Sequence, residues 1–144
     1  MTSTSLNFVG FVNQVQVGMS VGLEQELFRL DAILVEELMQ MPGLLSYASL
    51  RTSFGTWYNL VLMNDDQVGS NLKEGVHHQY AAYQLAPQCY KWICIHSGTL
   101  LGGVRGNRFE LQRTKYYAPY NADSTDRTFR VHENTYARDM HVTR

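Results

Sequence analysis

The most constraining feature of the sequence is a long amphipathic segment, residues 22–41, which stops abruptly and is followed at once by extended runs. Its leucines recur every three or four residues, and this spacing predicts a helix with one apolar stripe. Ser20 is placed to cap the start of the helix, and Pro42-Gly43 ends it. A helix with a single apolar stripe must cover another layer, so we expect a helix packed on a sheet.

The remaining segments complete this picture. A second helix is predicted over residues 66–86, where Pro87 disfavours continuation. Five segments have the alternation or the composition of strands: residues 7–17, 44–52, 56–63, 91–97 and 108–117. The order strand, helix, strand, strand, helix, strand, strand is that of the split βαβ, or ferredoxin-like, plan. The expected fold is therefore α+β, with an antiparallel sheet that carries both helices on one face.

Such a sheet leaves its other face uncovered. We expect residues 1–118 to form one domain, because a chain of this length buries a sufficient core. Residues 119–144 are polar with few apolar anchors, so we expect a C-terminal arm or tail with a short strand at Thr128–His132. The simplest cover for the second face is the same face of a second copy. The sequence therefore predicts a homodimer through sheet packing, a dimeric α/β barrel.

Charge and hydropathy exclude two classes of partner. The net charge of −1 and the pI of about 6.5 give no electrostatic footprint for nucleic acid. No run approaches about 18 apolar residues, so we expect no membrane span. Cys89 and Cys94 lie five residues apart, without the second pair that a zinc site needs. We therefore expect a cytoplasmic protein with two reduced, structural thiols.

A glycine-rich segment, residues 98–107, follows the fourth predicted strand. It lacks the GxxxxGK[ST] pattern of a P-loop, and it does not open a helix after a parallel strand, which excludes a dinucleotide-binding fingerprint. Two interpretations remain: a mobile lid, with Arg105 meeting an anionic ligand, or a plain connection between strands.

The adjacent histidines, His77 and His78, lie in the second predicted helix. Neighbours on a helix point about 100° apart, so the two rings cannot hold one metal ion as an i, i+4 pair does. We expect no metal site here. Either both rings are structural or solvated, or one of them lines a pocket as a proton shuttle or hydrogen-bond donor.

Alternation along the strands separates the candidate residues into faces. Asn13 falls among apolar neighbours, where a buried amide needs a partner. Trp57 and Tyr58 point to opposite faces of the third strand. One face of the fourth strand holds Trp92, Cys94 and His96, which is typical of either a pocket floor or an interface centre. One face of the fifth strand is expected to hold Phe109, Leu111, Arg113 and Lys115.

Three passages together resemble a known superfamily. They are the helix end and strand MPGLLSYASLR, the hairpin through FGTWYNLVLM, and the second helix with its His-His pair. Over roughly residues 6–117 the layout is similar to that of the dimeric α/β-barrel superfamily, which includes antibiotic-biosynthesis-monooxygenase-like and haem-degrading proteins.

The resemblance implies a monooxygenase-like protein that binds a small hydrophobic, aromatic or polyketide-like molecule and oxidises an electron-rich substrate without a cofactor. The protein would hold the substrate as its anion, and dioxygen would react with it. The superfamily places an asparagine on the first strand and a histidine or aromatic residue on the second helix, which correspond here to Asn13 and to His77 or His78. The resemblance thus implies Asn13 and His77 as catalytic residues. Four further residues are expected to bind the substrate: Trp57, Tyr58, Tyr80 and His96.

Two alternatives stay open. The chain can be a non-catalytic ligand-binding or assembly protein that acts as a dimer, and its nine tyrosines suit an interface as well as a pocket. It can also bind haem through His77, His78 or His96. The haem-degrading branch carries a tryptophan ahead of its helical histidine, at a place where this chain has Gln67-Val68. We favour the interpretation without haem.

Overall fold

The computed structural model describes residues 6–64, 67–102, 105, 108–119 and 129–136. In chain order its elements are β1 (Leu6–Val15), α1 (Val21–Met39), β2 (Leu44–Arg51), β3 (Thr56–Met63), α2 (Gln67–Glu74), α3 (Val76–Tyr80), the π-helical turn η1 (Ala81–Leu85), α4 (Ala86–Cys89), β4 (Tyr90–Leu101), β5 (Arg108–Pro119) and β6 (Phe129–Thr135).

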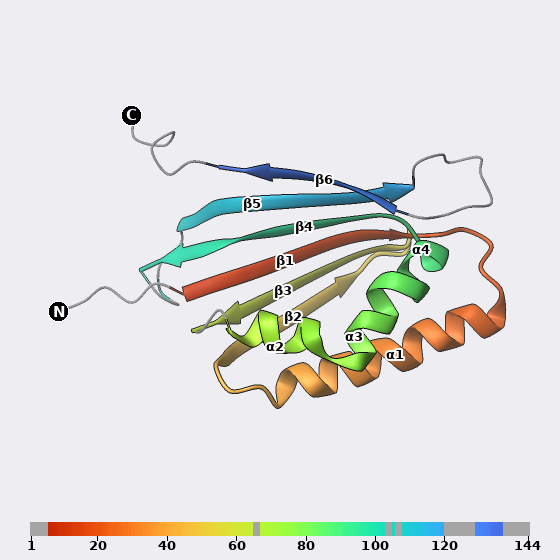
Figure 1. The fold of residues 1–144 in the computed structure, drawn as a ribbon, viewed down its shortest axis with the longest axis horizontal. Coiled ribbons are helices and arrows are strands. Elements are labelled where there is room, and N and C mark those ends of the chain that lie inside the picture. Colours follow the sequence, from red (N-terminus) through yellow and green to blue (C-terminus); the bar gives the residue numbers. More distant parts are fainter. Residues whose placement is uncertain (1–5, 65–66, 103–104, 106–107, 120–128, 137–144) are drawn as a thin grey trace.

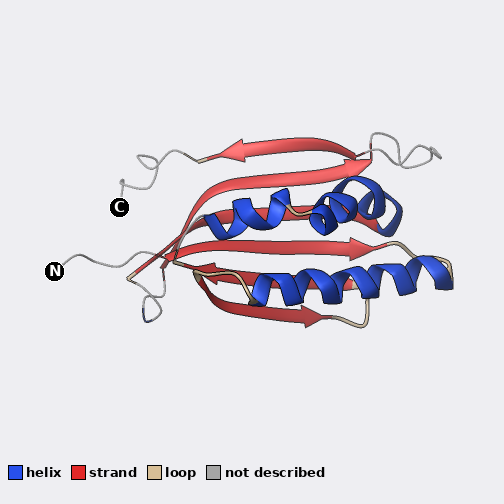
Figure 2. Ribbon diagram, turned by 60° about the horizontal axis from the view of Figure 1, so that its bottom comes forward, coloured by secondary structure: helices blue, strands red, loops and turns tan. Residues whose placement is uncertain are grey.

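The strands form one antiparallel sheet in the order β2-β3-β1-β4-β5-β6 (Figure 1). The first four strands in this order, with α1 and the second helical segment between them, make up the ferredoxin-like plan, so the predicted fold class is confirmed. All the helices lie on one face of the sheet (Figure 2). We call the other face, which carries Val12, Tyr58, Leu60 and His96, the open face.

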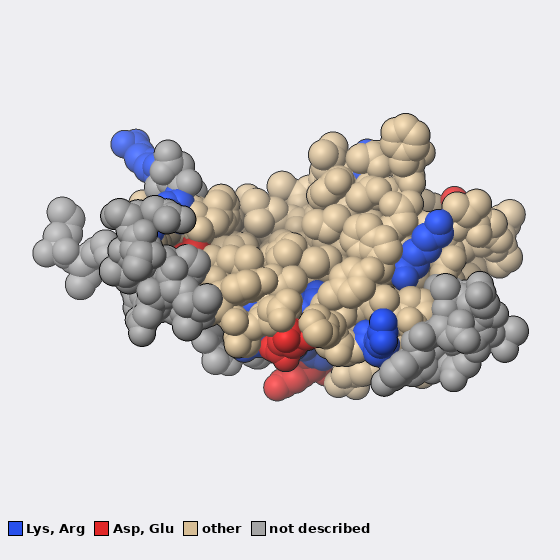
Figure 3. All heavy atoms as spheres, turned by 90° about the horizontal axis from the view of Figure 1, so that it is seen from above, with Lys and Arg blue, Asp and Glu red and all other residues tan. Residues whose placement is uncertain are grey.

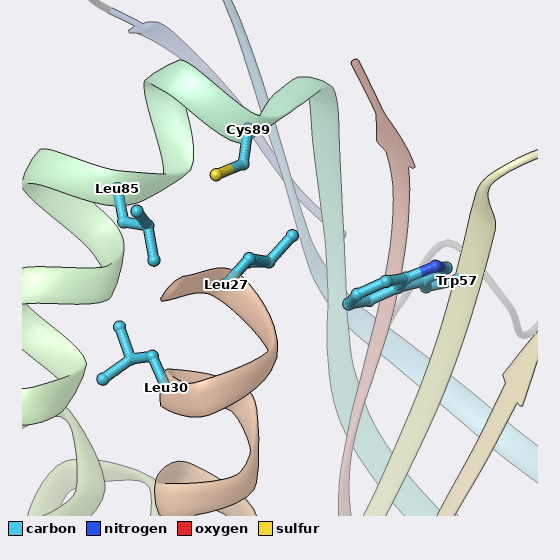
Figure 4. Packing of buried hydrophobic residues seen from close by; sticks show 5 residues of the cluster. All are labelled: Leu27, Leu30, Trp57, Leu85 and Cys89. Atoms are coloured by element: carbon cyan, nitrogen blue, oxygen red, sulfur yellow. The ribbon is translucent and has the colours of Figure 1, made fainter. Parts of the chain in front are cut away.

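Helix α1 buries the stripe that the sequence predicts. Leu27, Leu30 and Leu38 are buried, and the Ser20 side chain accepts a hydrogen bond of 3.2 Å from the Leu23 backbone N–H, as expected of an N-cap. Figure 4 shows the main cluster, in which side chains from α1, β3 and the second helical segment point toward one another: Leu27, Leu30, Trp57, Leu85 and Cys89. Each fully buried leucine contributes about 1.5–3 kcal/mol to the stability of this contact.

The second helical segment differs from the single helix predicted over residues 66–86. It is divided into α2, α3, η1 and α4. Gly75 makes the first break, with extended backbone angles of φ −68° and ψ 145°, because glycine weakens a helix interior. Pro87 does not end the segment, since it lies in the first turn of α4, where its missing N–H is not needed. The segment therefore runs on to Cys89.

Strand β4 is longer than predicted, and this changes the interpretation of the glycine-rich segment. Gly98 to Leu101 continue the strand, and the turn begins at Gly102, whose φ of +85° suits glycine. Within the predicted lid, residues 103, 104, 106 and 107 lie outside the described part of the chain, and Arg105 is exposed.

A β-bulge in β5 corrects the predicted facing of its side chains. Ser97 pairs with Arg113 but Gly98 pairs with Leu111, so Gln112 is an extra residue on β5. The extra residue reverses the alternation, because side chains keep to one face only along an unbroken ladder. The predicted common face is therefore wrong: Arg113 and Lys115 lie on the helix side, and Phe109 and Leu111 lie on the open face.

The polar segment after residue 118 supplies the sixth strand, close to the short strand expected at Thr128–His132. β6 pairs with β5, and the two strands extend the sheet beyond the helices (Figure 2). Arg113 Nε lies 3.2 Å from Glu133 Oε1 across this pair, and the Tyr136 backbone N–H donates to the Gln112 carbonyl oxygen at 2.9 Å. Residues 120–128 and 137–144 of the expected arm lie outside the described part of the chain.

Candidate functional site

Asn13 lies in a row of side chains that crosses the helix side of the sheet. Its register partners are Trp57 on β3 and Ile93 on β4, and Trp57 in turn lies opposite Arg51 on β2. The Asn13 side chain is only 7% exposed, and among the described residues no donor reaches its Oδ1. A buried carbonyl oxygen without a donor costs about 1–3 kcal/mol. The partner that the sequence predicts for this amide is thus not supplied by the described part of the chain.

Trp57 is enclosed by aromatic and cationic groups. Phe28 of α1 stacks on its ring with centroids 5.8 Å apart, and Tyr90 meets it edge-on at 6.2 Å. The Arg51 guanidinium carbon lies 4.2 Å from the Trp57 ring centroid, and Arg51 Nη2 is held 2.8 Å from Asp31 Oδ2. Sequence reasoning missed all three partners of Trp57. The register of the predicted hairpin could have identified Arg51, which lies opposite Trp57, whereas Phe28 and Tyr90 reach it from separate segments that no spacing links.

Burial shifts the pKa values of groups beside this cluster. It raises the pKa of the Tyr90 phenol well above its ordinary value, and the nearby Asp31 carboxylate adds to this effect. It also raises the pKa of the Cys89 thiol to about 11. Both groups therefore stay protonated at neutral pH, and neither is a nucleophile or a base in its resting state.

The predicted residues of the second helical segment lie in different surroundings. Tyr80 is half-buried and packs against the cluster that contains Trp57. His77 points to α1 instead, where its Nδ1 lies 2.5 Å from Glu37 Oε1, and its side chain is 47% exposed. Burial, together with the charge of Lys73, lowers the pKa of His78. Tyr80 thus shares the helix side with Asn13 and Trp57, whereas His77 contacts Glu37 at the surface.

The other two predicted residues, Tyr58 and His96, lie on the open face. Both line a shallow hollow of about 320 Å³. The rest of its lining on this face is backbone and apolar side chain, from Gly10, Val12, Ala48, Leu50 and Leu60. A second hollow of about 390 Å³ shares Val12 and His96 with the first and adds Trp92, Cys94 and Tyr116. The predicted common face of Trp92, Cys94 and His96 is therefore confirmed.

The structure divides the predicted site into two layers separated by the sheet. The helix side holds Asn13, Trp57 and Tyr80, and the open face holds Tyr58 and His96. Residues on opposite faces cannot contact one bound molecule within a single chain. Only the helix-side group combines an aromatic enclosure with a polar atom that lacks its partner, and we take it as the candidate site.

Three further observations bear on the classes of ligand. Among the described residues no group of three or more His, Cys, Asp or Glu side chains gathers where it could hold a metal ion. None of the helices in the described ranges has the length and apolar character that crossing a bilayer requires. Viewed from the β6 edge, the described surface is mostly uncharged, with lysine and arginine in a few separate places and acidic residues gathered mainly at one side (Figure 3).

No protein-family model and no curated protein sequence matches the chain. Among solved structures it is similar to a protein from Shewanella oneidensis, with 10% identity and a TM-score of 0.57 over 71% of this chain and 96% of the other. It is also similar to a protein from Pseudomonas aeruginosa, with 16% identity and a TM-score of 0.52 over 66% and 92% of the two chains.

A cofactor-independent oxygenase from Streptomyces nogalater matches more weakly, with 16% identity and a TM-score of 0.43 over 74% of this chain and 99% of the other. At such identities a likeness shows the fold alone. The first two structures share with this chain the α+β fold that the sequence predicts.

Proposed function

We propose that the chain binds a small aromatic or polyketide-like molecule between its helices and its sheet and oxidises it with dioxygen, in the manner of a cofactor-independent monooxygenase. The observation that carries this proposal is the Asn13 amide, whose Oδ1 is buried without a donor in the described part of the chain. A hydroxyl group of a ligand would supply that donor and recover the roughly 1–3 kcal/mol that the buried oxygen costs.

The surroundings of Asn13 suit an aromatic ring. Trp57 lies directly beside it and presents a flat apolar surface, and Tyr80 packs on the same cluster from the second helical segment. In the proposed reaction a methylene carbon of the bound molecule loses a proton, and the resulting anion reacts with dioxygen. One oxygen atom stays on that carbon as a carbonyl, and the other leaves as water with the two hydrogens. The protein contributes orientation and proton transfer.

His77 keeps the role of proton acceptor in this proposal, as the sequence predicts. Its ring is bonded to Glu37 at the surface, so it would have to leave this partner to reach the substrate. The Glu37 contact makes the role testable, because a surface contact of this kind contributes less than about 1 kcal/mol to stability, so a variant without it should stay folded. A His77→Gln variant that stays folded but loses oxidation would support the assignment, and one that keeps full activity would remove His77 from the mechanism.

The proposal also includes a homodimer formed by two open faces, placed in the cytoplasm, where both cysteines remain reduced. Apolar side chains stand out from this face in a way that is uncommon for a monomer. Large ones that are exposed on it include Leu50, Tyr58, Phe109 and Tyr116.

The two tryptophans of the chain allow a test that distinguishes the two faces. Trp57 lies on the helix side and Trp92 lines the open-face hollow. In a Trp92→Phe variant, anthrone, a tricyclic ketone with an oxidisable methylene group, should quench Trp57 fluorescence in a saturable way. Asn13→Ala in the same background should raise the dissociation constant about tenfold, which corresponds to about 1.4 kcal/mol. Oxygen uptake should match quinone formation one to one.

Three other results would change the conclusion. Quenching of Trp92 in a Trp57→Phe variant, with no response from Trp57, would move the ligand to the open face and overturn the helix-side site. Binding at Trp57 without oxygen uptake would favour the non-catalytic ligand-binding alternative. A visible haem absorption band in the freshly purified protein would overturn the cofactor-free part of the proposal.

A further inference from the structure

A chain of polar side chains crosses the open face from β4 to the end of β6. Cys94 Sγ lies 3.4 Å from His96 Nε2, and His96 Nδ1 lies 2.9 Å from Thr114 Oγ1. The Tyr136 hydroxyl donates to the same Thr114 oxygen at 3.3 Å. None of these four residues belongs to the helix-side site around Asn13. The thiol of Cys94 and the imidazole of His96 thus lie within hydrogen-bond distance of each other on the open face.

The separation of the two donor atoms fits one kind of metal geometry. With Zn–S and Zn–N bonds of about 2.3 and 2.05 Å, a tetrahedral angle places sulfur and nitrogen about 3.5–3.6 Å apart. A linear arrangement of the same bonds would need about 4.3 Å. The observed 3.4 Å therefore matches two corners of a zinc tetrahedron and does not match a linear two-ligand site.

The partner of the second ring nitrogen completes the argument for His96. A metal-binding histidine usually bonds its other nitrogen to an oxygen, which fixes the tautomer and the orientation of the ring. Thr114 Oγ1 can accept from Nδ1–H, as it accepts from Tyr136, because a hydroxyl oxygen has two lone pairs. In this tautomer Nε2 carries the free lone pair and points at Cys94. The stacked rings of Trp92 and Tyr116, 6.3 Å apart, line the same hollow as the pair.

Two ligands make only half of a structural zinc site, and their position indicates where the other half lies. β4 is one of the two central strands of the six-stranded sheet, and Cys94 and His96 lie near the middle of β4. When two identical faces pack about a two-fold axis, residues near the centre of the face meet their own copies. We infer that Cys94 and His96 form half of a Zn²⁺ site, which the same two residues of a second copy complete across the open face.

This inference rests on the proposed dimer, and it adds to the dimer a ligand and a reason for the position of Cys94 and His96 near the centre of the open face. Zn²⁺ has no redox chemistry, and a closed site with four protein ligands holds structure together. The ion would thus fasten the two sheets, and the oxidation proposed for the helix side would proceed without it.

Cobalt(II), which replaces zinc and reports thiolate bonding in its absorption spectrum, tests the inference. The full chain is first freed of metal with a chelator, and native mass spectrometry gives its oligomeric state. Addition of Co²⁺ should then produce a thiolate-to-cobalt band and one ion for each two chains. Cys94→Ser and His96→Gln should each abolish the band, and Thr114→Val should weaken affinity about 10–100-fold. Cys89→Ala, which removes the other thiol, should keep the band.

The other outcomes separate this inference from the proposed dimer. A metal-free dimer that gives no cobalt band, or a band that survives Cys94→Ser, overturns the zinc site and leaves the dimer standing. One ion for each single chain overturns the sharing between copies. A monomer at every concentration, with or without metal, overturns both and means that something other than a second copy covers the open face.

Discussion

Asn13 occupies a place in β1 where an apolar side chain of similar size would complete the core, because its neighbours across the sheet are Trp57 and Ile93. Its amide oxygen meets no donor among the described residues. Asn59, on the same side of β3, differs in this respect, since its Oδ1 accepts a hydrogen bond of 2.9 Å from the Tyr47 hydroxyl. The amide oxygen of Asn59 thus has a hydrogen-bond donor, whereas that of Asn13 has none among the described residues. Buried polar groups without a hydrogen-bond partner are expected at functional sites.

Asn13→Leu should therefore raise the free energy of unfolding by about 1 kcal/mol while it abolishes ligand binding on the helix side, because it removes a buried oxygen that lacks a donor. Urea denaturation measures the first effect and Trp57 fluorescence the second. Asn59→Leu is the matched control and should lower the free energy of unfolding by about 1–2 kcal/mol, since it leaves the Tyr47 hydroxyl without its acceptor. Destabilisation by both variants would show that Asn13 is already satisfied in the free protein.

At the scale of elements, the periodicity of apolar residues was enough to predict the regular helices and strands. It did not predict the irregular features. The apolar stripe of α1 and the hairpin of β2 and β3 follow from spacing and turn residues, and both are confirmed. The break at Gly75, the π-helical turn and the bulge at Gln112 each depend on how neighbouring segments fit together. A single sequence carries no period for such features, which is why the second helix and the facing of β5 were mispredicted.

At the bulge between β4 and β5, position 98 has no room for a side chain and requires glycine. A β-carbon at Gly98 would clash with the carbonyl oxygen of Glu110, whereas a β-carbon at Gly10 on β1 would have its nearest neighbours 4.0 Å away. Gly98→Ala should lower the free energy of unfolding by about 3 kcal/mol or more, because backbone must move. Gly10→Ala should change it by less than about 1 kcal/mol. Thermal unfolding of both variants measures the difference, and equal losses would contradict the bulge geometry.

At the scale of the whole molecule, the sheet has a covered face and an open one, and the sequence predicted this division together with the need for a cover. Of the site, the sequence identified Asn13, Trp57 and Tyr80 as candidates, and the structure brings these three to one layer. It could not show that His77 points away from that layer toward Glu37 of α1, because the direction of a helical side chain depends on the tilt of the helix over the sheet. The sequence placed Cys94 and His96 on one face of the fourth strand, but it could not show the contact of His96 with Thr114, which joins β4 to β5.

A charge placed on the open face should prevent the proposed dimer. Leu50 is 62% exposed there, and Leu50→Glu should raise the dissociation constant of the dimer at least about tenfold, because two carboxylates would be buried in one interface. Val131 is 54% exposed on the helix side of β6, and Val131→Glu should leave the dimer intact. Sedimentation velocity over a range of concentrations compares the two, and equal effects would place the interface elsewhere.

The extra residue in β5 has a consequence for how this chain can change. On one side of Gln112 the strand turns apolar residues to the open face, and on the other side it turns cations to the helix side, so one insertion sets the character of two surfaces. A substitution at Gln112 would not change which way the side chains of β5 point, because the side chain there is exposed and the number of residues in the strand stays the same. Removing the residue would exchange the two faces over half of the strand. Single-residue deletions along β5 would therefore reveal the effect of this extra residue on the two faces, whereas substitutions at Gln112 would not.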